Sequence, residues 1–133
     1  MTIRWRSTFS TGIHSIDQQH QELIEMINEF GDINEAKVHD SEVDDLLKRL
    51  NQYVIFHFSH EESLMDHHFI ASAHRESHLK QHADFATQVQ LSLTSQVDGC
   101  LVKDNLVAFL EAWLTSHILV TDMALAKLIH TRN

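Results

Sequence analysis

Helix-breaking residues are scarce in this chain of 133 residues, which has no proline and only three glycines. Both residue types disfavour helix interiors, so their scarcity favours long helices over a sheet with many turns. A single cysteine, Cys100, excludes a disulfide framework and a paired-cysteine zinc or redox motif. Residues 1–12 are polar and lack the apolar core of a signal peptide, and no run approaches the length of a membrane span. We therefore expect a cytoplasmic protein with no membrane partner.

Basic residues are also few. Ten Lys and Arg residues stand against 19 Asp and Glu residues, for a net charge of −9, which argues against a nucleic-acid partner. The length suits one domain over residues 1–133, and a hydrophobic content of 43% is ordinary for a globular protein. What the chain has in excess is histidine, with twelve residues.

Four segments carry apolar residues at the three- and four-residue steps of a helix that faces a core. We predict helices at about residues 16–36, 41–67, 72–97 and 101–130, with a capping box at 15–18 opening the first. Short connectors imply antiparallel neighbours, so the predicted fold is all-α, an antiparallel up-down-up-down four-helix bundle.

Residues 1–15 show no helical period and are predicted to form an extended N-terminal arm that packs Ile3, Trp5 and Phe9 on the bundle. The last helix is predicted to turn seven residues inward, at Leu106, Leu110, Trp113, His117, Val120, Ala124 and Leu128.

The second predicted helix places a histidine and a carboxylate, His57 and Glu61, within its apolar stripe. A buried carboxylate is costly unless a positive group lies beside it. No Lys or Arg lies within one turn of Glu61, so a metal ion is the simplest partner. The sequence therefore predicts a metal site whose other ligands come from the remaining helices.

Each of the other predicted helices offers ligand candidates in its own stripe. Residues four apart on a helix are turned by only about 40° from each other, so both can reach one centre. Counting from the connectors at about 1.5 Å per residue places the candidates at one level and favours His78 and His82 over His74, which stays the alternative. Asp122 lies about 140° from His117 on an α-helix and would flank the centre from another side. The candidate ligands are His20, His57, Glu61, His78, His82, His117 and Asp122.

The composition of this set narrows the choice of metal. Five imidazoles and two carboxylates are too many for one ion and suit two. The lack of thiolates argues against structural zinc, and nitrogen-rich ligation argues against magnesium or calcium. Imidazole with carboxylate suits iron, copper, nickel or zinc, and carboxylates that bridge paired ions indicate di-iron or di-manganese. The Glu-x-x-His pattern of ferritin-like proteins is absent.

Taken together, the motifs resemble those of the bacterial hemerythrins. The resemblance covers nearly the whole chain, through GIHSIDQQH (12–20), HFSHEE (57–62), HLKQH (78–82) and WLTSHI (113–118) with Asp122. It implies an oxo- or hydroxo-bridged pair of iron ions with one open position for O2. It also implies these ligand roles: one iron on His78, His82 and His117, the other on His20 and His57, and bridges from Glu61 and Asp122.

The function that the resemblance implies is reversible O2 binding at a five-coordinate iron, for carriage, storage or delivery to an oxidase, rather than catalysis. Two alternatives stay open: an O2 or redox sensor that acts on a separate signalling partner, and a di-iron enzyme that handles peroxide or NO. A histidine phosphotransfer bundle is disfavoured because it needs one exposed reactive histidine, whereas the candidates here face inward. The residues expected to line a dry gas pocket are Leu23, Phe58, Trp113, Leu114 and Ile118.

Overall fold

A computed structural model describes residues 3–32, 42–94 and 99–131 of the chain. Within these ranges all the regular elements are helical. They are a 3-10 turn (Ser7–Phe9), α1 (His14–Asp32), α2 (Glu42–His67), α3 (Ser72–Thr94), α4 (Gly99–Trp113), the π-helical segment η3 (Leu114–Asp122) and α5 (Met123–Thr131). The last three elements follow one another directly and form one long helix.

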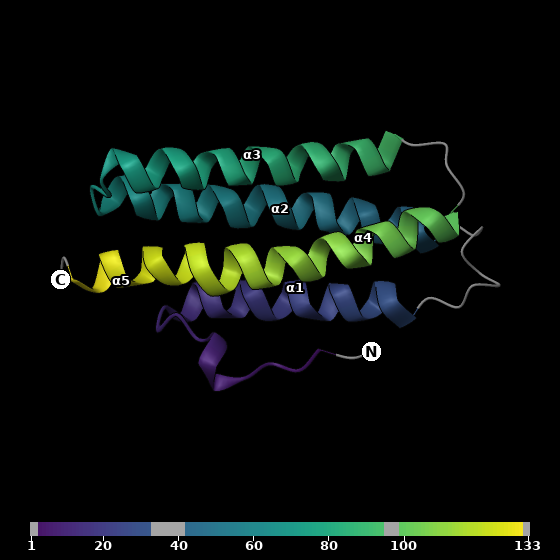
Figure 1. Ribbon diagram of the computed structural model, residues 1–133, viewed down its shortest axis with the longest axis horizontal. Helices are drawn as coiled ribbons and strands as arrows, with labels where there is room; N and C mark the ends of the chain where they lie inside the picture. Colours follow the sequence, from purple (N-terminus) through teal and green to yellow (C-terminus); the bar gives the residue numbers. More distant parts are fainter. Residues whose placement is uncertain (1–2, 33–41, 95–98, 132–133) are drawn as a thin grey trace.

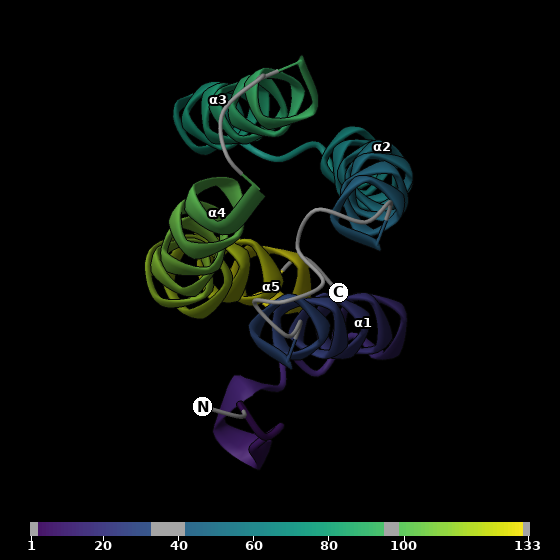
Figure 2. The same ribbon diagram turned by 90° about the vertical axis from the view of Figure 1, so that its right-hand side faces the viewer.

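The helices alternate in direction along the long axis of the molecule (Figure 1). Viewed along that axis, α1, α2, α3 and the α4–α5 helix stand at the four corners of a bundle (Figure 2). Helix α1 packs on α2 and α4, and α2 packs on α3. The predicted four-helix bundle is therefore confirmed. The connectors expected at 37–40 and at 97–98 lie outside the described residues, and Gly99 already belongs to α4.

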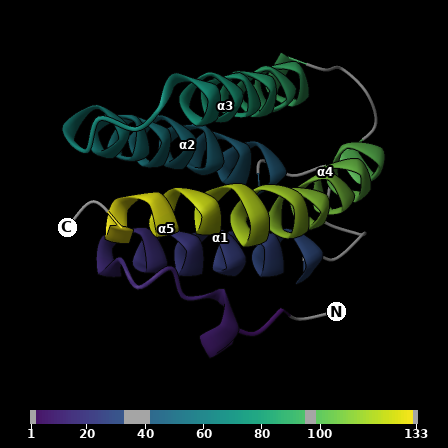
Figure 3. The same ribbon diagram turned by 60° about the vertical axis from the view of Figure 1, so that its left-hand side comes forward.

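The N-terminal arm lies along the outside of α1 (Figures 1 and 3). The backbone N–H of Ile3 donates to Oδ1 of Asn28 at 2.8 Å, and Nδ2 of Asn28 donates to the carbonyl of Ile3 at 2.9 Å. Ile3, Trp5 and Phe9 are partly buried against the main core, as predicted. One amide side chain of α1 thus fixes the arm by its backbone while apolar side chains anchor it.

Helix α1 begins at His14, and the predicted capping box that starts at Ser15 is wrong. Asp17, in the first turn, accepts hydrogen bonds from the hydroxyl of Ser10 (2.5 Å) and from the backbone N–H and hydroxyl of Thr11 (2.8 Å each). Partial burial alone would raise the pKa of Asp17, but these hydrogen bonds outweigh it and hold the pKa below its usual value. The Asp17 carboxylate therefore stabilises the start of α1 by binding residues that precede the helix.

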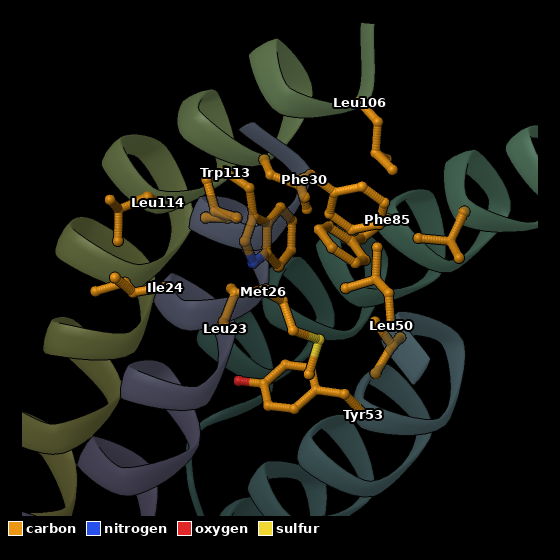
Figure 4. Packing of buried hydrophobic residues seen from close by; sticks show 14 of the residues in the cluster. Leu23, Ile24, Met26, Phe30, Leu50, Tyr53, Phe85, Leu106, Trp113 and Leu114 are labelled. Atoms are coloured by element: carbon orange, nitrogen blue, oxygen red, sulfur yellow. The ribbon is translucent and has the colours of Figure 1, made fainter. Parts of the chain in front are cut away.

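Two apolar clusters fill the bundle. The larger one draws on all four corners, and Figure 4 shows Phe30, Tyr53, Phe85 and Trp113 pointing into it. Burying one such side chain stabilises the fold by about 1.5–3 kcal/mol. The smaller cluster lies toward the other end of the bundle and consists of Met65, Ile70, Leu125 and Ile129. Buried polar residues separate the two clusters, with His57 and Glu61 on α2 and His117 and Asp122 on the last helix. We call this part of the bundle the polar layer.

The last helix, over Asn105–Thr131, is long and apolar enough to cross a membrane by length and composition alone. The expectation that no run approaches a membrane span is therefore wrong. The core helix of a globular protein passes the same test. Here the helix buries Leu106, Leu110 and Asp122 within the bundle.

Candidate metal centre

The polar layer contains all seven candidate ligands, and each of these side chains is at most 3% exposed. Their ligand atoms form two overlapping groups, and within each group the atoms lie within 4.8 Å of one another. The larger group is Glu61, His78, His82, His117 and Asp122, and the smaller is His20, His57, Glu61 and Asp122. The two carboxylates belong to both groups, so they lie between two adjacent positions for an ion.

Helix α3 contributes His78 and His82 to the larger group, and His74 belongs to neither. His74 is only partly buried, and its Nε2 lies 3.0 Å from Nδ1 of His78. The structure thus brings together the pair that the counting along the helices favoured. The alternative residue supports that pair from outside.

Asp122 reaches the layer because the last helix changes its pitch. From Leu114 to Asp122 the helix is a π-helix, in which hydrogen bonds join residues five apart. Residues i and i+5 therefore lie on one side, and Nε2 of His117 is 3.0 Å from Oδ1 of Asp122. The expected separation of about 140° is wrong because it assumed α-helical pitch throughout.

The same change of pitch moves the inward positions that follow it by one residue. Val120, predicted to face inward, is 62% exposed, and Ala124 is also exposed. Leu128 is only partly buried. The inward-facing residues beyond Asp122 are instead Leu125, Ala126 and Ile129.

Each of the five histidines brings Nε2 close to a carboxylate oxygen. The distances are 2.9 Å for His20–Asp122, 3.1 Å for His57–Glu61, 3.0 Å for His78–Asp122, 3.2 Å for His82–Glu61 and 3.0 Å for His117–Asp122. Nine buried atoms of these residues nevertheless have no hydrogen-bond partner. They are both ring nitrogens of His20, Nε2 of His78, His82 and His117, and both oxygens of Glu61 and of Asp122.

Buried polar atoms are nearly always paired in folded proteins, so this many orphans in one layer call for an explanation. Imidazole nitrogen and carboxylate oxygen are good ligands for transition-metal ions. A cation in each group would satisfy the Nε2 atoms and the carboxylate oxygens of this set together. The residues of the layer therefore fit a metal centre.

Both carboxylates are ionised in the metal-free layer. Burial alone would raise the pKa of Glu61, but the neighbouring histidines, His57 first, lower that pKa well below its usual value. Burial and the charge of Glu61 would likewise raise the pKa of Asp122, but contacts with three imidazoles lower it to about 2. The layer thus presents two negative charges to an incoming cation.

One histidine partly offsets these charges. Burial alone would lower the pKa of His78, but its contacts with Asp122 and Glu61 raise it to about 9. For His117 burial prevails, and its pKa lies below the usual value. Without metal, the layer therefore holds an imidazolium at His78 and a neutral imidazole at His117, and a bound cation would take over the role of that proton.

Four of the five histidines also have their second ring nitrogen held by a neighbour. The contacts of Nδ1 are His57 with Oε1 of Gln19 (2.5 Å), His117 with Oε1 of Gln81 (2.6 Å), His78 with His74 (3.0 Å) and His82 with Oε2 of Glu62 (3.3 Å). Such outer partners fix the orientation and tautomer of a metal-binding imidazole. We did not predict Gln19, Gln81 or Glu62 from the sequence.

Aromatic rings cover the layer on the side of the larger cluster. Phe58 stacks on His82 with ring centroids 3.8 Å apart, and Trp113 stacks on His117 at 3.9 Å. Tyr53 stacks on His57, and its hydroxyl donates to the backbone carbonyl of Gln19. The imidazoles are therefore held by flat contacts as well as by hydrogen bonds.

A groove of about 810 Å³ opens between α3 and α4–η3. Its lining includes Gln81 and Trp113, both of which contact His117. Solvent thus comes close to the residues that support one ligand of the larger group.

Comparison with known proteins agrees with this geometry. The family model "Hemerythrin HHE cation binding domain" matches residues 11–129. A bacteriohemerythrin of Pseudomonas aeruginosa (strain LESB58) is 32% identical over 114 residues, which cover 86% of this chain and 72% of that protein. A bacteriohemerythrin of Stenotrophomonas maltophilia (strain R551-3) is 29% identical over 127 residues, covering 92% and 78%. A hemerythrin-like protein of Naegleria gruberi is 30% identical over 121 residues, covering 90% and 87%.

Proposed function

This chain belongs to the hemerythrin family, and from that premise we propose that it is a non-haem di-iron protein that binds O2 reversibly. The observation that carries the proposal is the pair of buried ligand groups that share Glu61 and Asp122. Two iron ions held there would supply the electrons for reversible binding of O2.

The two ligand groups differ in the number of groups that they offer. The larger has five residues and would hold one iron through His78, His82, His117 and the two carboxylates. The smaller has four residues and would hold the other iron through His20, His57 and the same carboxylates. With one ligand fewer, the iron in the smaller group would keep one coordination position open for a diatomic gas.

The surrounding side chains would keep water away from that position. The five residues expected to line the gas pocket are all buried, at 9% exposure or less, and they are Leu23, Phe58, Trp113, Leu114 and Ile118. A dry pocket protects a reactive ligand from loss of protons to solvent. The outer partners of the imidazoles, which contact Nδ1, would leave the Nε2 atoms available to the ions.

The test is iron analysis followed by optical spectroscopy of the reduced protein through cycles of O2 exposure and removal. We expect two irons per chain and near-ultraviolet and visible bands that appear with O2 and disappear without it. Irreversible oxidation at the first exposure would contradict reversible binding and favour the sensor of O2 or redox state. Catalytic consumption of peroxide or NO by the loaded protein would favour the enzyme.

The physiological setting is part of the proposal. We expect O2 as the ligand, a cytoplasmic location, and either an oxidase or a signalling partner that receives the result of binding. The acidic net charge of −9 supports a protein that does not bind nucleic acid.

A further inference from the structure

We propose that Gln81 is a positioning residue that fixes the tautomer of His117, and that Thr121 and Ser77 hold Gln81 in the required orientation. The importance of this arrangement for iron binding rests on the proposed function. The arrangement itself can be tested in the metal-free protein.

The side-chain amide of Gln81 has three partners. Its Oε1 lies 2.6 Å from Nδ1 of His117 and accepts a hydrogen bond from the Thr121 hydroxyl at 2.9 Å. Its Nε2 donates to the Ser77 hydroxyl at 3.3 Å. The amide therefore bridges α3 and the π-helical segment, and the carbonyl end faces the histidine.

The orientation of this amide decides where His117 carries its proton. A neutral imidazole has one N–H, and a carbonyl oxygen at Nδ1 requires the proton to be there. Nε2 is then bare and available to a metal ion, and it has no hydrogen-bond partner. The Asp122 carboxylate, with Oδ1 3.0 Å from Nε2, favours a proton on Nε2 instead, so the contact with Gln81 has to outweigh that of Asp122. If the amide were rotated by half a turn, its NH2 would face Nδ1, and the ring proton would move to Nε2, the atom meant for the metal.

Gln81 needs the contacts with Thr121 and Ser77 because its side chain is not fully buried. Gln81 lines the groove between α3 and α4–η3, where water can compete for its amide. Thr121 gives Oε1 a second hydrogen-bond partner and so helps to hold the amide in place beside His117. Thr121 lies in η3, so the wide helical turn that brings Asp122 inward also carries this donor.

A second glutamine, which contacts a histidine of the smaller ligand group, provides a matched control for Gln81. Gln19, on α1, presents Oε1 to Nδ1 of His57 at 2.5 Å, and His57 belongs to the smaller ligand group, which does not include His117. A variant at Gln19 should therefore alter His57 alone, and a variant at Gln81 should alter His117 alone. This pairing separates a local effect on one ligand from general damage to the bundle.

The first measurement is the tautomer of each histidine in metal-free protein, read from ¹⁵N shifts and long-range ¹H–¹⁵N couplings after ¹⁵N-histidine labelling. We expect the proton of His117 on Nδ1 in the wild type. Gln81→Met, which keeps the volume and removes the hydrogen bonds, should populate the Nε2–H form. Thr121→Val should shift the same equilibrium by less, and Thr121→Ser should restore it.

The second measurement is affinity for Fe²⁺ in competition with a chelator. Loss of such an outer partner costs about 10- to 100-fold in metal affinity, which is the fall expected for Gln81→Met. Gln81→Glu retains an acceptor and adds a charge, so it should bind Fe²⁺ and lower the reduction potential of the loaded protein.

The proposal is overturned if His117 carries its proton on Nε2 in the wild type, or if Thr121→Val and Thr121→Ser behave alike. Unchanged Fe²⁺ affinity in Gln81→Met would overturn it as well. Should Gln81→Met fail to fold, the two Thr121 variants decide the question. A protein that shows the expected tautomers but binds no O2 would refute the proposed function and leave the role of Gln81 intact.

Discussion

The metal-free protein should lose stability as the pH rises from 7 to 9.5, because His78 gives up its proton over that range. Contacts with Asp122 and Glu61 raise the pKa of His78 in the folded chain to about 9, against an ordinary value of 6.5. A group with a raised folded pKa stabilises the fold fully below its unfolded pKa. That contribution is lost as the pH rises through the folded pKa.

The size of the effect follows from the shift. A difference of about 2.5 pH units, at about 1.4 kcal/mol each, gives roughly 3 kcal/mol when the group is fully protonated. About 2 kcal/mol of it should disappear between pH 7 and 9.5. His117 acts in the opposite direction, but its lowered pKa confines that effect to pH values below about 6.5. Glu61 and Asp122 have lowered pKa values and stay ionised throughout.

The assay is urea unfolding followed by circular dichroism, on protein freed of metal by a chelator, at several pH values from 7 to 9.5. His78→Gln removes the titrating group, so its free energy of unfolding should vary less with pH than that of the wild type. Iron-loaded protein should also lack the decline, because a metal-bound nitrogen cannot take the proton. Parallel pH profiles for the metal-free wild type and His78→Gln would refute this reasoning.

Three further predictions concern the ligands, the π-helical segment and the start of α1. His57→Ala and His82→Ala should purify with clearly less iron by elemental analysis, and a full complement of two irons in either would contradict the ligand assignment. Val120→Ser should change the free energy of unfolding by less than about 0.5 kcal/mol, whereas Leu125→Ala should cost about 2–5 kcal/mol in the same denaturation assay. Equal costs would contradict the π-helical register. Asp17→Ala should lower stability by about 0.5–2 kcal/mol at neutral pH, and because the pKa of Asp17 is lowered, the difference from wild type should shrink in thermal melts as the pH falls below about 4.

The bundle could be predicted because its apolar stripes are long and uninterrupted. A stripe such as Leu46, Leu50, Val54 and His57 keeps helical spacing over several turns, and all four residues are buried. The same spacing revealed the ligands, since a histidine or carboxylate in such a stripe has to face the core.

The π-helical segment could not be predicted from that spacing. A stripe analysis assumes a constant 3.6 residues per turn, and the extra residue between His117 and Asp122 breaks the assumption. Constant spacing therefore predicts that Val120 faces inward, whereas the buried residues around it are Ile118 and Asp122. A clue was nonetheless present, because an aspartate five residues after a candidate ligand fits a π-turn and does not fit an α-turn.

The residues that contact Nδ1 of the histidines were harder to predict from the sequence than the ligands. Gln19 lies three residues after Ile16, and Gln81 lies three residues after His78, so both fall at stripe spacing. Glutamine is usually a surface residue, and spacing alone does not separate an inward amide from a solvated one. The entry to α1 was missed for a similar reason, since Asp17 bonds backward to Ser10 and Thr11, outside the usual capping pattern.

The polar layer divides the apolar interior into unequal parts, with Met65, Ile70, Leu125 and Ile129 on the minor side. In metal-free protein, the layer between those four side chains and the larger cluster would keep its buried atoms without hydrogen-bond partners. We expect the amides at the end of α2 and in α5 to exchange with deuterium ahead of the others in that state. Loading with iron would join both parts into one cooperative unit, so the proposed metal centre would also determine how the protein unfolds.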